Sequence, residues 1–130
     1  MSDKFTVEII SPDKSIIKTE ANEVNIPSYE GEIGILKDHI PLITFLRPGL
    51  VSIVEANTSK KLFIEDGIVE FSNNQLLILS STVKKIEDIE KKSIDEIISS
   101  SQKLMDKDGI TDKEKYLLSY KIETLKSIYQ

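Results

Sequence analysis

The feature that most constrains this chain is a change of hydrophobic period at Lys84-Lys85. Before it, apolar residues alternate with polar ones in short segments separated by turns, and after it they recur every three or four positions. A period of two is typical of half-buried strands, and a period near 3.6 is typical of amphipathic helices. We therefore predict an antiparallel β-sandwich (a flattened barrel) over residues 1–85, followed by an antiparallel two-helix hairpin over residues 86–130.

The first part contains many short apolar segments at close spacing, which favours a sandwich. Phe5, Val7 and Ile9 alternate with polar residues and precede a turn at 11–14. A strand beginning near Val24 is expected to end at Pro27, which has no backbone amide to donate. Further strands are expected at 16–18, 34–36, 50–54, 61–65, 68–71 and 76–79, with Asn73-Asn74 as a tight turn.

Two apolar stripes predict the helices of the second part. The first consists of Ile94, Ile97, Ile98 and Met105, and the second of Leu118, Ile122, Leu125 and Tyr129. Residues 106–109 separate them, and Thr111 with Glu114 matches a capping box. Because the stripes are narrow and Ser99-Ser100-Ser101 interrupts the first, the hairpin should bury little surface and be the less stable part.

Composition argues against several classes of protein. The net charge is −5, with 22 acidic residues mixed among 17 basic ones, whereas a nucleic-acid binder would present a basic face. The chain has no cysteine, so disulfides and thiolate metal sites are excluded. We see no signal peptide in the sequence. We also see no apolar run that approaches the roughly 20 residues of a membrane helix, so we expect no direct membrane insertion.

Motifs for catalysis are sparse. No glycine precedes a lysine as a phosphate-binding P-loop requires. His39 is the only histidine, and a hydrogen-bonded role at a turn or interface is favoured over a catalytic pair. Glu30 and Glu32 could act as paired carboxylates, but the glycines beside them favour a solvated turn. The Gly-x-x-Gly of residues 31–34 has an acid where an RNA-binding KH loop needs basic residues.

The order of residues resembles the epsilon subunit family of the rotary ATP synthases along nearly the whole chain. The resemblance is carried by "VEIISPDKSI", "VNIPSYEGEIGILKDHIPLITFLRPGLVSIV", "FIEDGIVEFSNNQLLILSSTV" and "IEDIEKKSID". Family members typically show Ser-Pro at the first turn, a central Glu-Gly-Glu-x-Gly-Ile-Leu-x-x-His-x-Pro-Leu-x-Thr, and Pro-Gly before the next strand. The family's architecture, a sandwich followed by a helical hairpin, agrees with the periodicity.

The resemblance implies a non-catalytic rotor subunit of the central stalk, bound to gamma and to the ring of c subunits, without a cofactor. It implies a peripheral position on the cytoplasmic face of a bacterial inner membrane. The implied c-ring contacts are Glu30, Gly31, Glu32 and Gly34, and the implied gamma contacts are His39, Pro41 and Leu42. Glu32 is the first choice for a ring contact.

The resemblance also implies that the C-terminal helices can restrain ATP hydrolysis at the alpha/beta catalytic head. Candidate regulatory residues are Glu90, Ser93, Lys113, Lys115, Lys121 and Lys126. Some members bind ATP through Ile/Leu-Asp-x-x-Arg-Ala, where this chain has Ser93 for arginine and Ile94 for alanine. Because lysine does not replace a guanidinium fork, Lys91 and Lys92 should not restore the site, and ATP binding should be weak or absent.

Two departures from the family pattern concern loops. Asp66-Gly67 stands where many members have Gly-Gly, and Lys37-Asp38 where they have Pro-Gly. Aspartate tolerates left-handed backbone angles, so both loops should form.

Two other functions stay open from the residues alone: a small sandwich hydrolase using Glu30, Glu32 or His39, and a stand-alone ligand-binding sandwich with a docking tail.

Overall fold

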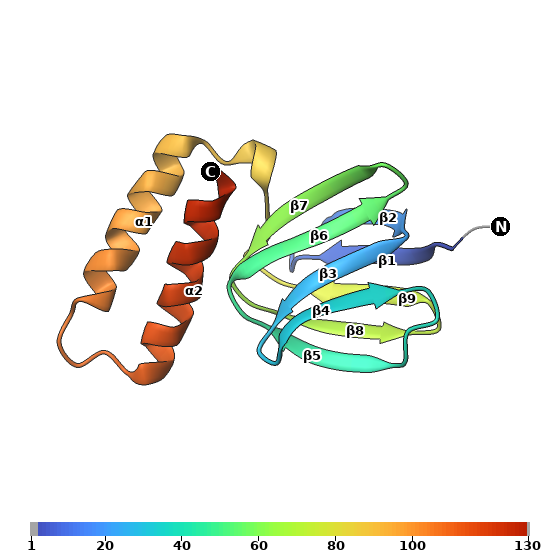
Figure 1. The fold of residues 1–130 in the computed structure, drawn as a ribbon, viewed down its shortest axis with the longest axis horizontal. Coiled ribbons are helices and arrows are strands. Elements are labelled where there is room, and N and C mark those ends of the chain that lie inside the picture. Colours follow the sequence, from blue (N-terminus) through green and yellow to red (C-terminus); the bar gives the residue numbers. More distant parts are fainter. Residues whose placement is uncertain (1–2, 130) are drawn as a thin grey trace.

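The computed structural model describes residues 3–129 as a β-sandwich with a helical hairpin against one end (Figure 1). The strands are β1 (Phe5–Ile10), β2 (Ser15–Ala21), β3 (Glu23–Ser28), β4 (Gly31–Leu36), β5 (Leu42–Leu46), β6 (Gly49–Glu55), β7 (Thr58–Ile64), β8 (Gly67–Ser72), β9 (Gln75–Leu79) and β10 (Lys84–Lys85). A short 3-10 helix, η1 (Ile86–Asp88), leads into α1 (Lys91–Met105) and α2 (Asp112–Ile128). The predicted fold, a sandwich followed by two helices, is confirmed.

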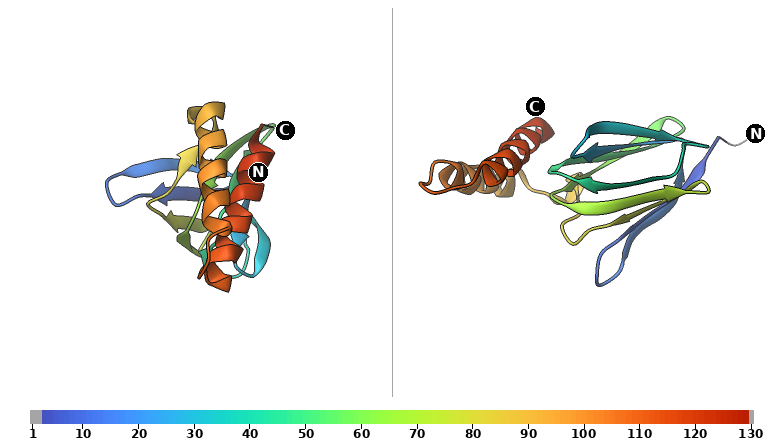
Figure 2. Two further views of the ribbon diagram at one scale, coloured as in Figure 1. Left: turned by 90° about the vertical axis from the view of Figure 1, so that its left-hand side faces the viewer. Right: turned by 90° about the horizontal axis from the view of Figure 1, so that it is seen from below.

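One curled sheet forms both layers of the sandwich, which face each other in the right-hand view of Figure 2. The strand order is β10-β7-β6-β3-β5-β8-β9-β1-β2, and β4 pairs with β3 beside this path. The sheet passes from one layer to the other between β3 and β5, which are paired at Ser28 and Leu46. Neighbouring strands run antiparallel, while β1 and β9 run parallel.

Alternate residues of the strands fill the space between the layers. Phe5, Val7 and Ile9 are all buried, as their alternation predicts. The ring of Phe71 meets Phe5 edge-to-face, with centroids 5.5 Å apart and ring planes at 90°. This geometry is favoured by aromatic quadrupoles and adds to the stabilisation from burial.

The prediction that Pro27 ends its strand is wrong, because β3 continues through Pro27 to Ser28. On one side of β3, Pro27 pairs with Glu32 of β4. On the other side, β6 is paired with 23–25 and β5 with Ser28, so Pro27 falls between two partner strands. Its carbonyl accepts a hydrogen bond from the amide of Arg47 at 3.0 Å, and the missing donor therefore interrupts neither ladder.

Two strands were not predicted. β5 lies in an apolar run, residues 40–46, whose lack of alternation hides its period of two. β10 is only 2 residues long and consists of two exposed lysines, so it carries no apolar signal.

The turns largely behave as expected. Asn73 and Asn74 have φ angles of 50° and 58°, which confirms the predicted tight turn. Asp38 has a φ of 68°, so aspartate does occupy a left-handed position there. Asp66, in contrast, does not have a positive φ, and its loop needs no glycine-like residue at that point.

The hairpin forms as predicted, and Thr111 and Glu114 make both hydrogen bonds of the capping box. The interruption of the first stripe by serines is less severe than expected. Ser101 lies seven positions after Ile94, on the same face, and is one of the two fully buried residues of α1. A small side chain on this inner face is consistent with close approach of the helices, whereas Ser99 and Ser100 are exposed.

A second, smaller apolar cluster joins the hairpin to the sandwich. Phe63 of β7 is buried together with Ile89, Ile94 and Leu125, and Leu50 of β6 packs against them. Lys121 of α2 adds an ion pair to Glu65, with Nζ 2.9 Å from Oε1. The hydroxyl of Tyr129 donates to the carbonyl of Ile89 at 2.7 Å, so the end of α2 is tied to the start of the hairpin.

Candidate partner-binding surfaces

The outer face of β5, β8 and β9 exposes large apolar side chains. Ile43 is 72% exposed, Phe45 59%, Ile68 43% and Leu79 44%. These strands are hydrogen-bonded neighbours, so the four side chains lie on one surface, which we call the apolar face. Single exposed apolar residues are ordinary, but a continuous group of this kind marks an interaction site.

A groove of about 960 Å³ lies at the end of the apolar face that is nearer to α2, and Phe45, Ile68 and Leu79 contribute to its lining. Three charged side chains border it: Glu30 from the β3–β4 turn, Asp66 from the loop before β8 and Lys113 from the first turn of α2. The groove therefore offers an apolar floor with charges at its rim, as protein–protein interfaces commonly do.

The β3–β4 turn is stiff, although it is exposed. The hydroxyls of Ser28 and Thr44 are buried and 2.8 Å apart, and Ser28 Oγ also accepts a hydrogen bond from the amide of Glu30 at 3.0 Å. The amide of Tyr29 donates to the carbonyl of Phe45 at 3.2 Å. Gly31 has a φ of +114°, a conformation that residues with a side chain rarely adopt, so this glycine is required by the backbone.

Glu32 follows the turn and approaches the only arginine of the chain. Its Oε1 lies 3.8 Å from Nη2 of Arg47, a long ion pair, and its side chain is 64% exposed. Arg47 is 8% exposed, and its guanidinium lies over the ring of Tyr120 of α2, with Cζ 3.9 Å from the ring centroid. The carboxylate of Glu32 is therefore available to a partner while it stays next to the hairpin.

The loop after β4 carries the predicted gamma contacts. The backbone amide of Asp38 donates to Asn74 Oδ1 at 2.7 Å, and Nδ2 of Asn74 donates to Asp38 Oδ1 at 2.9 Å. These two hydrogen bonds connect the loop to the β8–β9 turn. Nδ1 of His39 lies 2.7 Å from the carbonyl of Ile40, and its ring meets Phe71 edge-on at 5.9 Å. The histidine is thus held at a turn.

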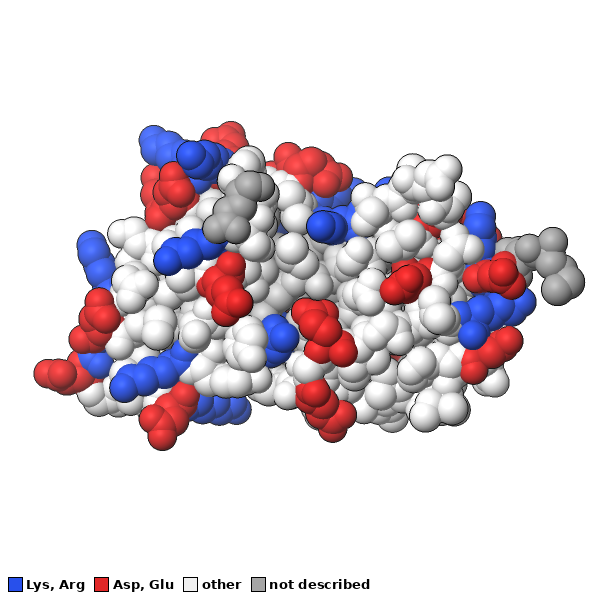
Figure 3. All heavy atoms as spheres, viewed as in Figure 1, with Lys and Arg blue, Asp and Glu red and all other residues white. Residues whose placement is uncertain are grey.

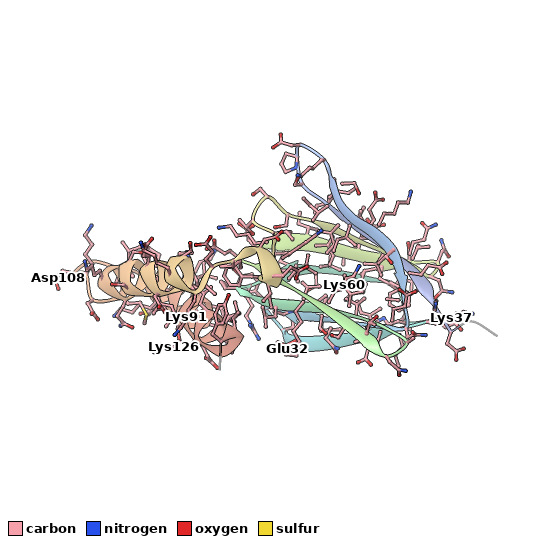
Figure 4. All side chains as sticks on the ribbon, turned by 90° about the horizontal axis from the view of Figure 1, so that it is seen from above. Glu32, Lys37, Lys60, Lys91, Asp108 and Lys126 are labelled. Atoms are coloured by element: carbon pink, nitrogen blue, oxygen red, sulfur yellow. The ribbon has the colours of Figure 1, made fainter. Side chains whose placement is uncertain are left out.

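The two predicted contact segments lie at opposite ends of β4. Figure 4 shows Glu32 at the end of the sandwich that faces the hairpin and Lys37 at the far end. The structure therefore separates Glu30, Gly31 and Glu32 from His39 and Pro41, although they are close in sequence. Gly34 lies midway along β4, and Leu42 turns inward and packs against the core.

The predicted regulatory residues also differ in their placement. Glu90 and Ser93 are exposed at the start of α1, whereas Ile94, which stands where the ATP motif has alanine, is buried against the sandwich. On α2, Lys113, Lys115 and Lys126 are exposed, while Lys121 forms an ion pair with Glu65. Figure 4 shows Lys126 on the hairpin near the sandwich and Asp108 at its far tip.

The charged surface is mixed. Basic and acidic side chains alternate over the face in Figure 3, with uncharged surface between them on the sandwich. Within residues 3–129, no cluster of three or more His, Cys, Asp or Glu side chains is suited to hold a metal ion. No helix in the described part of the chain has the length and apolar character needed to cross a membrane.

Comparison with known proteins identifies the family to which this chain belongs. Residues 4–86 match the family model described as "ATP synthase, Delta/Epsilon chain, beta-sandwich domain". The chain belongs to the ATP synthase delta/epsilon chain family. The ATP synthase epsilon chain of Pelagibacter ubique is 43% identical over 129 residues, covering 98% of this chain and 99% of that one. The ATP synthase epsilon chain of Nitrobacter winogradskyi is 30% identical over 106 residues, covering 81% and 78% of the two chains.

Solved structures of ATP synthases share the fold of this delta/epsilon family member. A chain of the Euglena gracilis mitochondrial assembly "OSCP/F1/c-ring" superposes with a TM-score of 0.84 at 14% identity, covering 100% of this chain and 84% of that chain. A chain of the Tetrahymena thermophila "central stalk/cring" assembly gives a TM-score of 0.64 at 14% identity, covering 96% of each. The fold is therefore kept at very low sequence identity.

Sequence reasoning missed the apolar face and Arg47. The signal for Ile43 and Phe45 was present, because an apolar run without alternation indicates a strand that is apolar on both sides. Arg47 gave no such signal, since nothing in the sequence places residue 47 beside residue 120.

Proposed function

We propose that this chain is a non-catalytic central-stalk subunit of a rotary ATP synthase, where it links gamma to the c ring and so couples proton flow to ATP synthesis. The observation that carries this proposal is family membership over the whole sandwich, together with a relative of 43% identity at nearly full length. A hydrolase using His39 or Glu32 has no such support. His39 contacts a backbone carbonyl and Phe71, and Glu32 contacts Arg47.

The apolar face is the best candidate for the gamma contact. Its side chains are large and exposed, and the neighbouring loop with His39 and Pro41 is held by the Asp38–Asn74 pair. A stiff apolar surface of this kind loses little conformational entropy on binding, which suits a permanent interface. We therefore extend the predicted gamma surface from His39 and Pro41 to Ile43 and Phe45.

The β3–β4 turn is the candidate for the c-ring contact. Glu30 and Glu32 are exposed carboxylates on a backbone fixed by Ser28 and Gly31. Such charges determine the register and specificity of binding to a basic or amide-bearing loop more than they add affinity.

The hairpin would be a separable unit that could bind the alpha/beta head through its exposed lysines. The whole chain would lie peripherally at the cytoplasmic side of the inner membrane.

The gamma contact is tested by replacing Ile43 and Phe45 together with serine. We expect affinity for purified gamma to fall about tenfold or more, because apolar anchors dominate such interfaces. Leu104→Ser is the matched control, since Leu104 is also exposed but lies on α1, outside the sandwich. Unchanged affinity in the double variant, measured by calorimetry, would remove the apolar face from the interface.

The ring contact is tested by Glu32→Lys in reconstituted vesicles. A charge reversal on an exposed side chain should change folding little but weaken coupling of hydrolysis to proton pumping. Gamma binding should be retained, because Glu32 lies near the start of β4 while His39 is bonded to Leu36 at the end of the same strand. Normal pumping by this variant would exclude Glu32 as a ring contact.

A further inference from the structure

A single carboxylate, that of Glu70, lies in the middle of the apolar face. Glu70 is paired in register with Ile43 of β5 on one side and with Leu77 of β9 on the other. Ile68 lies two positions earlier in β8 and therefore points to the same side of the sheet. The side chain of Glu70 is exposed, and its neighbours on the surface are mostly apolar.

Glu70 has no counter-charge in its own chain. In the described part of the chain, its carboxylate accepts no hydrogen bond and forms no ion pair. The strands β5, β8, β9 and β1 contain one other charged residue, Glu8, which lies in the same cross-strand row, two strands and about 10 Å from Glu70. Glu8 is paired in register with Lys18 and accepts a hydrogen bond from Ser15 Oγ at 3.1 Å. Glu8 is thus compensated within the chain, whereas Glu70 is not.

This carboxylate limits what can cover the apolar face. An apolar partner surface would remove Glu70 from water, and the cost of desolvating an unpaired carboxylate outweighs the gain from burying a neighbouring apolar side chain. Acidic groups also outnumber basic ones at the border of the adjoining groove, where Glu30 and Asp66 accompany Lys113. A partner therefore fits best if it combines apolar side chains with a positive group opposite Glu70.

A second copy of this chain does not meet that requirement. The charged residues of these four strands are Glu70 and Glu8, so pairing of two apolar faces would bring carboxylates together or bury them against apolar side chains. An unpaired charge at such a place opposes self-association and leaves the face open to a basic partner.

We infer that the segment of gamma that covers the apolar face carries a lysine or arginine opposite Glu70, flanked by apolar side chains. The inference rests on the gamma contact proposed above, and it adds the chemistry of the partner and a residue that determines specificity. Ile43 and Leu77 would shield the resulting ion pair from water, which strengthens the attraction between the charges. The pair would fix the register of gamma on a face whose apolar contacts alone are not directional.

The experiment measures the affinity of the full-length chain for purified gamma by calorimetry. Glu70→Gln keeps the size of the side chain and should weaken binding about tenfold, because it leaves the cation of gamma unpaired. Glu70→Lys places two cations together and should weaken binding about a hundredfold or more. Glu23→Lys, the same change of charge on β3 in the other layer, is the control and should leave the affinity unchanged. Circular dichroism verifies that the variants fold.

The possible results separate this inference from the proposed function. If the wild-type chain binds gamma and both Glu70 variants bind as tightly or more tightly, the carboxylate is unpaired in the complex and the inference is refuted, while the proposed function stands. If the wild-type chain does not bind gamma, the proposed function fails, and the inference with it. If sedimentation shows that the free chain forms a dimer, and replacing Ile43 and Phe45 with serine abolishes it, the face belongs to a second copy and the inference is also refuted.

Discussion

The sandwich and the hairpin are held together in different ways. The sandwich has a continuous core contributed by strands from both layers, with Phe71, Ile9 and Ile26 fully buried. The hairpin rests on a smaller cluster around Phe63 and Leu125, one ion pair and a group of aromatic contacts. Stability follows the apolar area removed from water, so the sandwich should resist opening while the hairpin opens more readily. A rotor subunit needs the first property for its permanent contacts, and the second would allow the hairpin to respond to partners.

The largest effect is expected in the sandwich core. Phe71→Ala should lower the free energy of unfolding by about 3–5 kcal/mol, because it leaves a cavity between the layers and removes the edge-to-face contact with Phe5. Urea unfolding followed by circular dichroism measures this loss. Phe45→Ala is the matched control, since Phe45 is 59% exposed and its loss should cost far less. Equal losses in the two variants would mean that the sandwich does not have the predicted core.

A smaller and local effect is expected from Leu125→Ala. Leu125 is 1% exposed within the hairpin cluster, so its truncation should weaken docking by about 2–4 kcal/mol. Faster hydrogen exchange in α1 and α2, with the sandwich unchanged, would support the comparison between the two regions. Leu104→Ala, at a position 49% exposed on α1, should have little effect. If Leu125→Ala destabilised the sandwich equally, the two regions would be one cooperative unit.

Loss of the helix cap should cost less again. Thr111 accepts a hydrogen bond from the Glu114 amide at 3.1 Å, and Thr111→Ala removes it at a cost of about 1 kcal/mol to the hairpin. Hydrogen exchange of the first turn of α2 reports this change. Thr111→Ser keeps the hydroxyl and should retain most of the protection. Identical exchange in the alanine and serine variants would show that the cap contributes nothing to the hairpin.

The smallest effect concerns alkaline pH. Partial burial, and next the neighbouring Tyr120, raise the pKa of Tyr116 above its usual 10.0. Folding therefore favours the neutral phenol of Tyr116. Its contribution to the stability of the folded state is complete below about pH 10 and is lost as the pH rises through the raised pKa. The chain has four tyrosines and no tryptophan, so tyrosine absorbance follows the titration directly.

Tyr116→Phe provides the control for that titration. It should remove the late-titrating phenol and reduce the loss of hairpin docking above about pH 10. An unchanged titration curve in this variant would mean that another tyrosine carries the shift.

Much of the fold could be predicted because it depends on local patterns. The alternation of Phe5, Val7 and Ile9, the Asn73-Asn74 turn and the Thr111 capping box were all visible in the sequence, and each forms as expected. Pro27 misled the prediction because its effect depends on which strands lie beside it. The interface residues proposed from the resemblance, including Glu32 and His39, remain predictions.

The sequence by itself determined the division into a sandwich and a helical hairpin, eight of the ten strands, the mixed charge and the family, since each follows from residues that are near one another or in a set order. The tertiary structure alone decided that Glu32 and His39 lie at opposite ends of a strand and that β5, β8 and β9 form one apolar face. It also decided that Arg47 lies over Tyr120, 73 residues later in the chain. Such contacts depend on how the sheet curls and where the hairpin docks, and these are set by the packing of the whole core rather than by any local pattern.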